Sequence, residues 1–366
     1  MRKIINVALV QGISRSGYLM TSDNYSDIAF GIHSKVQRYS WVTYYMFGLL
    51  SSLIGDTLIL AASFQKKAFN VNILIVTVIQ HIAICDLTIT ITSTLPIVIS
   101  LLANSWVLGD GLCYARAYIY YLVYPAGMYL IAVLTTGKFM ILRYPIQAAR
   151  WSTKTAHRVC CLIWVFALTN PLAKVVIDKD DVMFDYRNYC CSYGYSSQLW
   201  KKVLPMAGLI YLIVPNVTIV ATTVPTLKYL ADARKSAKRI KGTVPWQGAL
   251  TVALTAVVSS ISTLPLTVYV IGKNFVRKDH LDWFHVNFFR ISTFLLLINI
   301  MSNFYVYTLT IKSFRRFLSA TVLSIVPVFL TSLNSGNRGA GNFIHIYLRT
   351  SIYQNILNQS LTISVS

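Results

Sequence analysis

The sequence predicts an all-α membrane protein, a bundle of seven transmembrane helices followed by a short amphipathic eighth helix. Hydrophobic residues make up 55% of the 366 residues and charged residues only 12%, which is more apolar than a typical soluble domain. Apolar segments of about 20 residues, long enough to cross a hydrocarbon core, recur along the chain. The Lys and Arg residues are clustered between these segments, so the net charge of +21 indicates membrane topology and no binding to nucleic acid.

Seven segments of this kind follow one another, each ending at polar or charged residues. The expected transmembrane helices cover residues 41–63, 72–102, 112–136, 159–177, 203–227, 249–272 and 286–311. The chain is therefore divided into an N-terminal tail (1–40), a seven-helix domain (41–317) and a C-terminal tail (318–366). The apolar run that opens the last tail contains Pro327 and is at the lower length limit for a span, so it is assigned to the tail.

The distribution of basic residues orients the bundle. Clusters lie after the first, third and fifth spans, and the last cluster consists of Lys228, Arg234, Lys235, Lys238, Arg239 and Lys241. Cytoplasmic loops carry an excess of Lys and Arg, so the N-terminus is expected outside the cell, with membrane lipids around the bundle. The N-terminal tail contains Asn24-Tyr25-Ser26, an expected acceptor for N-glycosylation on that outer side.

Catalytic motifs offer no support for an enzyme. The chain carries none of the patterns HExxH, GxSxG or GxxxxGKS/T, and its six His residues lack metal-ligand partners at useful spacing. The six cysteines are too few for a disulfide scaffold in a chain of this length. We therefore expect a protein that is not an enzyme and that has a single local disulfide bond at most.

Several short residue patterns recur along the chain, in the predicted spans and in the loops that join them. In chain order they are Gly55-Asp56, Asp86, Trp106 with Gly109 and Cys113, Arg143-Tyr144-Pro145, Trp164, Pro215, Pro265, Asn303-Phe304-Tyr305-Val306-Tyr307 and Phe314-Arg315-Arg316. Their joint order and spacing, over roughly residues 41–317, resemble the rhodopsin-like (class A) G-protein-coupled receptors, of which this chain looks like a divergent member. The resemblance implies a multi-pass plasma-membrane protein that transduces binding of an extracellular small-molecule or peptide ligand to a heterotrimeric G protein.

Some of these patterns depart from the family. Gly137-Lys138-Phe139 stands in place of Asp-Arg-Tyr, Thr263 in place of the tryptophan before Pro265, Phe304 in place of a proline and Asp56 in place of an asparagine. The residues that the resemblance assigns to G-protein coupling are Lys138, Phe139, Arg143 and Tyr307. Because the inner motif is altered, a receptor-like protein with weak or no coupling is an alternative. An ion-coupled transporter or channel that uses the membrane-embedded aspartates is another.

The resemblance also implies a disulfide bond at the outer side. It would join Cys113 to the Cys190-Cys191 pair, with Cys191 the preferred partner and Cys190 the alternative. Cys85, Cys160 and Cys161 are expected to stay reduced.

The outer half of the third span carries a candidate ligand site. Arg116, Tyr120, Tyr124 and Gly127 follow helical spacing and so lie on one face of the helix. In the family this face lines the ligand cavity, and further candidates by position are Tyr121, Lys174, Leu266, Thr267 and Arg290. The alternative is that the tyrosines only pack and that the cations extend toward lipid headgroups.

Comparison with the positions of ligand-binding residues in the family disfavours two classes of ligand. Tyr120 stands where monoamine receptors carry an aspartate, so the ligand is not expected to be a typical monoamine. No lysine lies between Arg290 and Lys312, which excludes a retinal Schiff base in the seventh span.

The two aspartates inside predicted spans are candidates for a sodium or proton site. An ionisable side chain in a span is costly, so Asp56 and Asp86 are expected to be functional and to face the bundle interior. The resemblance makes them neighbours, with Asn299 and Asn303 supplying amides and a sodium ion as the one candidate cofactor. A purely structural hydrogen-bond network between spans one, two and seven is the alternative.

Overall fold

The computed structural model describes residues 35–65, 69, 72–177, 182–185, 190–193, 209–240, 246–272, 281–321 and 323. The predicted glycosylation site at Asn24 and most of both predicted tails lie outside the described residues.

Long helices account for all seven predicted spans within the described residues. They are α3 (Lys35–Ser63), α5 (Ile73–Ile89) continued by α6 (Leu95–Ala103), α7 (Gly109–Arg143), α9 (Thr153–Ile177), α11 (Val214–Ile240), α12 (Trp246–Gly272) and α13 (Leu281–Thr310). Six of these spans are long and apolar enough to cross a membrane over their described residues, while α12 has a shorter apolar stretch, Ala253–Val268. At 1.5 Å per residue, however, the whole of α12 is about 40 Å long. The predicted fold class is therefore confirmed.

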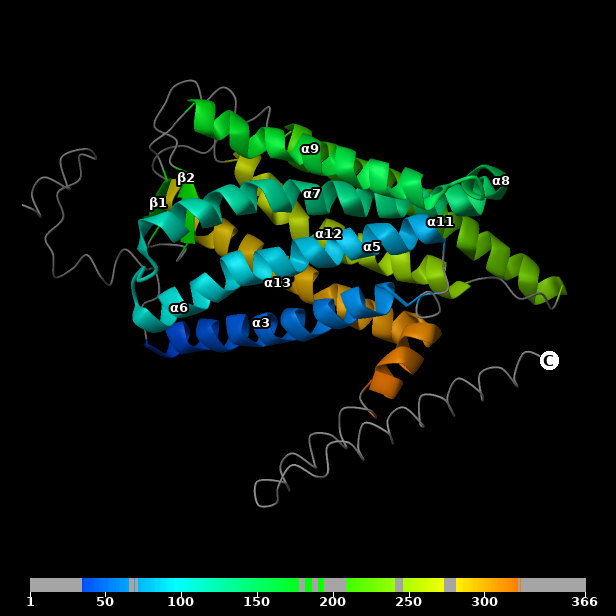
Figure 1. Cartoon of the computed structure of the whole chain (residues 1–366), viewed down its shortest axis with the longest axis horizontal. Helices are drawn as coiled ribbons and strands as arrows, with labels where there is room; N and C mark the ends of the chain where they lie inside the picture. The colour runs from blue at the N-terminus through cyan, green and yellow to red at the C-terminus, as the bar shows by residue number, and fades with distance from the viewer. Residues whose placement is uncertain are drawn as a thin grey trace, which may run out of the picture.

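The helices run side by side along the long axis of the molecule (Figure 1). Neighbouring contacts form a closed ring in the order α3, α5, α7, α11, α12, α13 and back to α3, with α9 packed outside this ring against α5 and α7. The centrally placed α7 therefore contacts both the second span and the α11–α12 side of the bundle, which gives it access to both halves of the interior.

Apolar side chains cover the outer surface of α9 and α11. Leu162, Val165 and Leu172 on α9 are exposed, as are Val217 and Val224 on α11. In a membrane such side chains contact lipid tails, whereas the backbone polar groups are satisfied within each helix. The exposed apolar surface is thus explained by the bilayer.

Two spans contain a π-helical turn, which the hydropathy pattern did not predict. In the second span, residues Thr90–Thr94 form such a turn between α5 and α6, and in the fifth span Leu209–Ile213 precede α11. π-Helical turns are rare and occur frequently at functional sites. The turn at Thr90–Thr94 contacts both α3 and α7, so it faces the bundle interior.

A small antiparallel hairpin lies at the end of the bundle where α7 begins (Figure 1). Its strands are β1 (Val182–Asp185) and β2 (Cys190–Tyr193), with Phe184 opposite Cys191. Both strands contact α7. The hairpin is an addition to the all-α architecture that the sequence predicted.

The predicted eighth helix is present at the opposite end. Residues 312–321 are helical, and Phe314 is fully buried while Lys312 and Arg315 are exposed. The ring of Phe314 stacks on Phe69 at a centroid distance of 5.4 Å. This helix is therefore amphipathic, and its aromatic face anchors it to this end of the bundle. We call this the inner end and the end with the hairpin the outer end, after the predicted orientation.

Candidate functional site

The predicted stripe on α7 forms a continuous stack of side chains. The guanidinium carbon of Arg116 lies 5.5 Å from the ring centre of Tyr120. The rings of Tyr120 and Tyr124 are parallel, 5.6 Å apart with an interplanar angle of 9°, and Tyr121 meets Tyr120 edge-on at 6.0 Å. The hydroxyl of Tyr124 is buried and has no partner among the described residues. The stack therefore ends in a polar group inside the bundle.

The remaining predicted ligand-binding residues are placed less completely. Leu266 and Thr267 are both buried on α12, where Thr267 donates to the carbonyl oxygen of Thr263 at 3.0 Å. The side chains of Lys174 and Arg290 lie outside the described residues.

The disulfide bond joins Cys113 to Cys191, as predicted, with 5.2 Å between the two Cα atoms. Cys85, Cys160 and Cys161 are free thiols, also as predicted. The bond attaches β2 to the first turn of α7, so the hairpin is held beside the outer end of the aromatic stack.

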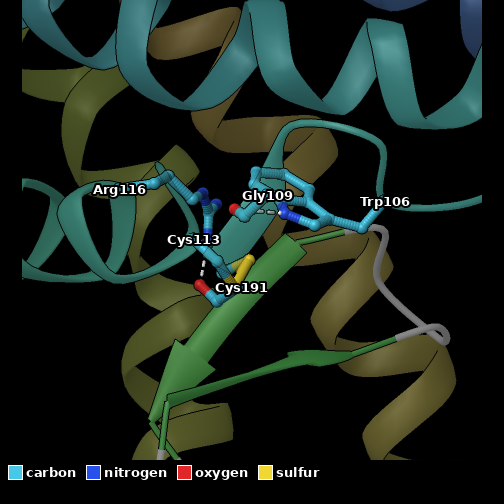
Figure 2. The surroundings of a disulfide bond; sticks show 5 residues. All are labelled: Trp106, Gly109, Cys113, Arg116 and Cys191. Atoms are coloured by element: carbon cyan, nitrogen blue, oxygen red, sulfur yellow. Dashed lines mark hydrogen bonds between the residues drawn. A yellow bond between two sulfur atoms is a disulfide. The ribbon is translucent and has the colours of Figure 1, made fainter. Parts of the chain in front are cut away.

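Figure 2 shows a second link beside this disulfide, in which Arg116 donates a hydrogen bond to the carbonyl oxygen of Cys191. The same view shows Trp106, whose indole N–H donates to the carbonyl oxygen of Gly109 at 2.8 Å. Gly109 has a φ of +77°, a conformation that favours glycine. The start of α7 is thus fixed by contacts from both outer loops.

Asp56 of α3 and Asp86 of α5 are both buried in the bundle interior. Ser52 donates to Asp56 Oδ2 at 2.5 Å and also meets the hydroxyl of Thr90 at 2.7 Å. The side-chain amide of Asn303 donates to Asp86 Oδ2 at 2.8 Å. These bonds therefore attach both neighbouring helices to the second span, α3 at its π-helical turn and α13 at Asp86 of α5. Ser52 and Thr90 were not predicted, although Ser52 precedes Asp56 by one helical turn.

The two predicted amides have different partners. Asn299 accepts a hydrogen bond from Ser259 of α12 at 2.8 Å, whereas Asn303 contacts Asp86. Asp56 Oδ1 and Asn303 Oδ1 are buried acceptors without a partner among the described residues. Unsatisfied buried oxygens are costly, and these two fit a small hard cation or, at the carboxylate alone, a proton. In the described part of the chain no cluster of three or more His, Cys, Asp or Glu side chains could hold a metal ion, so any ion here would need amide or hydroxyl oxygens as well.

At the inner end of α7, Lys138 is half-buried and Gly137 is packed against the neighbouring span. A Cβ atom at Gly137 would lie 3.3 Å from Leu74 and 3.6 Å from Ile75. Arg143 is exposed, with its guanidinium carbon 6.0 Å from the ring centre of Tyr144. Gly137 stands where rhodopsin-like receptors carry an aspartate, and here that position is surrounded by the apolar side chains of Leu74 and Ile75.

Tyr307 is fully buried on α13, and its ring meets Phe69 edge-on at 6.0 Å. Two hydroxyl contacts, which the sequence did not predict, join inner segments of neighbouring helices. Thr222 of α11 donates to Thr135 of α7 at 3.0 Å, and Thr251 of α12 donates to Thr310 of α13 at 2.6 Å. The inner segments are therefore cross-linked by neutral hydrogen bonds.

Comparison with known proteins identifies the family to which this seven-helix bundle belongs. Residues 55–307 match the family described as 7 transmembrane receptor (rhodopsin family). The chain belongs to this family.

Individual relatives are distant. The human uracil nucleotide/cysteinyl leukotriene receptor is 20% identical over 218 residues, which cover 58% of this chain and 56% of that receptor. Proteinase-activated receptor 1 of Cricetulus longicaudatus is 35% identical over 92 residues (24% of this chain, 21% of that protein). Melanopsin-B of Xenopus laevis is 25% identical over 127 residues (34% and 23%). The matched region spans little more than half the length of the first relative, 56%, and less of the other two.

The departure from the rhodopsin family in α12 has a clear structural consequence. Thr263, in place of an aromatic residue, is fully buried. Its one hydroxyl hydrogen is shared between two acceptors, Asn216 Oδ1 of α11 at 2.9 Å and the Ser259 carbonyl oxygen at 2.7 Å. The amide of Asn216 also contacts Thr267 at 3.4 Å. A polar network therefore joins α11 and α12 at the depth where the family's tryptophan would pack.

Proposed function

We propose that this chain is a plasma-membrane receptor that transduces binding of an extracellular ligand to a heterotrimeric G protein. The observation that carries the proposal is the course of α7 within a rhodopsin-family bundle. Its outer end carries the stack from Arg116 to Tyr124 beside a disulfide-anchored hairpin, and its inner end carries Lys138. One helix thus connects a candidate ligand site to a candidate coupling site, and the N-terminus would lie outside.

The proposed ligand is a small molecule or peptide, and neither a typical monoamine nor retinal. The relatives are named for uracil nucleotides, cysteinyl leukotrienes and proteinases, which supports an extracellular signal. A ligand that binds one arrangement of the helices more tightly shifts the population toward it. α12 contains Pro265, which frees a backbone carbonyl and permits bending, so its inner end can move relative to α7.

Weak coupling is the second candidate, and Gly137 and Lys138 favour it. Gly137 has no side chain to hold a cation, and Lys138 offers a compact ammonium in place of a planar guanidinium with five donors. A receptor with these residues would bind its ligand in the outer half of the bundle and activate G proteins less efficiently.

We further propose that the acid pair senses sodium or protons. Support comes from the unpaired buried oxygens of Asp56 and Asn303, since a cation could be held by both and a proton could bind the carboxylate of Asp56. Gly127 contributes no side-chain ligand of its own, and a Cβ there would lie 3.8 Å from Cys85, the residue before Asp86.

The deciding experiment displays the full chain on cells and reads second messengers through several G-protein types during a ligand screen. Ion flux is recorded in parallel. Ligand-dependent second-messenger changes without flux support the receptor, whereas ligand-dependent ion flux without G-protein activation contradicts it. Ligand binding without either response supports the weakly coupled alternative.

A further inference from the structure

Arg116 carries a positive charge that the described residues do not balance. Its side chain is only 8% exposed, in the second turn of α7. Its partners are the carbonyl oxygen of Cys191 and the ring of Tyr120, both neutral, and its Nε is buried without a partner in the described part of the chain. A guanidinium has five N–H donors and cannot be deprotonated in proteins. Within the described residues, Arg116 is therefore a buried cation that faces neutral groups.

Anchoring the hairpin does not explain this charge. The disulfide bond between Cys113 and Cys191 already attaches β2 covalently to α7, three residues before Arg116 (Figure 2). A neutral donor such as glutamine could supply the additional bond to the Cys191 carbonyl oxygen. Burying an unpaired charge costs far more than burying a neutral hydrogen-bonded group. The cost is accounted for if an anion joins the site during function.

The geometry around Arg116 points to one kind of ligand. We propose that Arg116 binds the acidic group, a carboxylate or a phosphate, of the extracellular ligand, and that Tyr120 and Tyr124 contact its uncharged part. The planar fork of a guanidinium matches two oxygens of such a group. The unpaired hydroxyl of Tyr124 offers a hydrogen bond at the far end of the stack. This inference rests on the proposed function, whose ligand site it specifies.

The first test compares charged probes with neutral analogues on the purified full chain in lipid nanodiscs. Uridine diphosphate is compared with uridine for phosphate, and indole-3-acetate with indole-3-acetamide for carboxylate. Binding to the folded state alone stabilises it by RT ln(1 + [L]/Kd), so the unfolding temperature rises with the concentration of a probe that binds. We expect the charged member of at least one pair to raise it by several degrees and its neutral analogue to leave it unchanged. No shift with either anion, or equal shifts within both pairs, would overturn the proposal.

The second test replaces the planar guanidinium group of Arg116, first with another cation and then with a neutral side chain. Arg116→Lys should weaken the charged probe's apparent affinity by about tenfold, because it keeps the charge and loses the planar fork. Arg116→Gln should abolish the shift while retaining a donor for the hairpin. Arg38→Gln is the matched control, since the guanidinium carbon of Arg38 also lies 5.5 Å from a tyrosine ring, that of Tyr39. Equal shifts in the parent and in Arg116→Gln would contradict the proposal, and if that variant does not fold, Arg116→Lys decides.

Failure of this inference is distinguishable from failure of the proposed function. Probe binding is read by unfolding temperature without a G protein, and nucleotide exchange on added G proteins is measured separately on the same samples. Agonist-dependent exchange without any effect of Arg116 substitution overturns the anion site alone. An Arg116-dependent shift without exchange on any G protein supports the anion site and contradicts coupling.

Discussion

Phe304 lies directly against the bare backbone of Gly55, where α3 and α13 cross. A Cβ atom at Gly55 would be 2.7 Å from the Cβ atom of Phe304 and 2.8 Å from its Cγ atom. Gly48, seven residues earlier, meets Leu297 in the same way, with a Cβ-to-Cδ2 distance of 2.5 Å. Small residues at such crossings let helix backbones approach closely in membranes. The aromatic residue that replaces the family's proline is therefore accommodated by a glycine on the neighbouring helix.

We expect Gly55→Ala to destabilise the protein by about 1 to 3 kcal/mol, because overpacking a tight contact forces neighbouring side chains to shift. Thermal unfolding of the purified chain measures the effect. Gly111→Ala is the matched control, since a Cβ there meets nothing within 4 Å. Phe304→Gly removes both contacting atoms, so Gly55→Ala should cost clearly less in a Phe304→Gly background than in the parent. An equally large cost of Gly55→Ala in both backgrounds would show that Phe304 is not the cause.

Removal of the disulfide bond should loosen the outer end of the bundle. Cys191→Ser is expected to cost about 2 to 5 kcal/mol, as for other native disulfides, and to lower cell-surface expression. Cys161→Ser, which removes an exposed free thiol, should have little effect. Peptide mapping without reduction should recover Cys113 joined to Cys191. Recovery of Cys113 as a free thiol would refute the bond.

The acid pair yields a prediction about ions. Asp56→Asn removes one carboxylate from a site whose unpaired oxygens suit a cation, so the unfolding temperature should lose its dependence on sodium or pH. The parent is titrated with sodium chloride and with choline chloride at constant ionic strength, at several pH values. Ser52→Ala, which removes only the hydroxyl that donates to Asp56, should retain the dependence in part. Overlapping titrations for parent and Asp56→Asn would instead identify a structural network.

The hydrogen bond between Thr251 of α12 and Thr310 of α13 is expected to stabilise the inactive arrangement of the helices by opposing separation of their inner ends. Thr251→Val keeps the shape and removes the 2.6 Å bond to Thr310. A net hydrogen bond contributes about 1 kcal/mol, so ligand-independent G-protein activation should rise by up to about fivefold. Thr308→Val serves as control, because the bond that Thr308 makes within the described residues lies inside its own helix, to the Phe304 carbonyl oxygen. Unchanged or lower basal activity in Thr251→Val would show that the bond does not restrain this movement.

The sequence predicted the features that depend on hydropathy or on motifs at fixed spacing. The seven spans, the bond from Cys113 to Cys191 and the helix around Phe314 belong to this group, and all are present. The contacts of Ser52 and Thr251 were missed because a short hydroxyl side chain finds its partner through the rotation of each helix about its axis. Hydropathy leaves that rotation open. The hairpin was missed because its strands, of four residues each, lie in a loop with no periodic signal.

The structure also changes the expectation for the inner end of α7. Because Gly137 is packed against Leu74 and Ile75, restoring the family's aspartate there would place a charge among apolar side chains. Gly137→Asp should therefore reduce expression, and it is unsuitable as a test of coupling. The informative position is the next residue along the helix.

Lys138 is expected to limit G-protein coupling. In the family an arginine at this position is held by the preceding aspartate in the inactive state and contacts the G protein in the active state. Without an aspartate the inactive lock is weakened, which by itself raises basal activity, while the ammonium of Lys138 should weaken the active complex. An exposed ion pair contributes about 0 to 1 kcal/mol, whereas a charge-assisted bidentate contact is stronger, so we expect the weakened complex to dominate.

Lys138→Arg should therefore increase agonist-stimulated nucleotide exchange at equal surface expression. The alternative is that Lys138 serves only as one of the inner cations that orient the chain in the membrane, in which case arginine would act equally well. Lys154→Arg is the matched control, because Lys154 is an exposed inner cation at the start of α9. A gain confined to Lys138→Arg supports the limiting role, since only that variant supplies a fork at the coupling position. Unchanged or reduced exchange in Lys138→Arg would refute it.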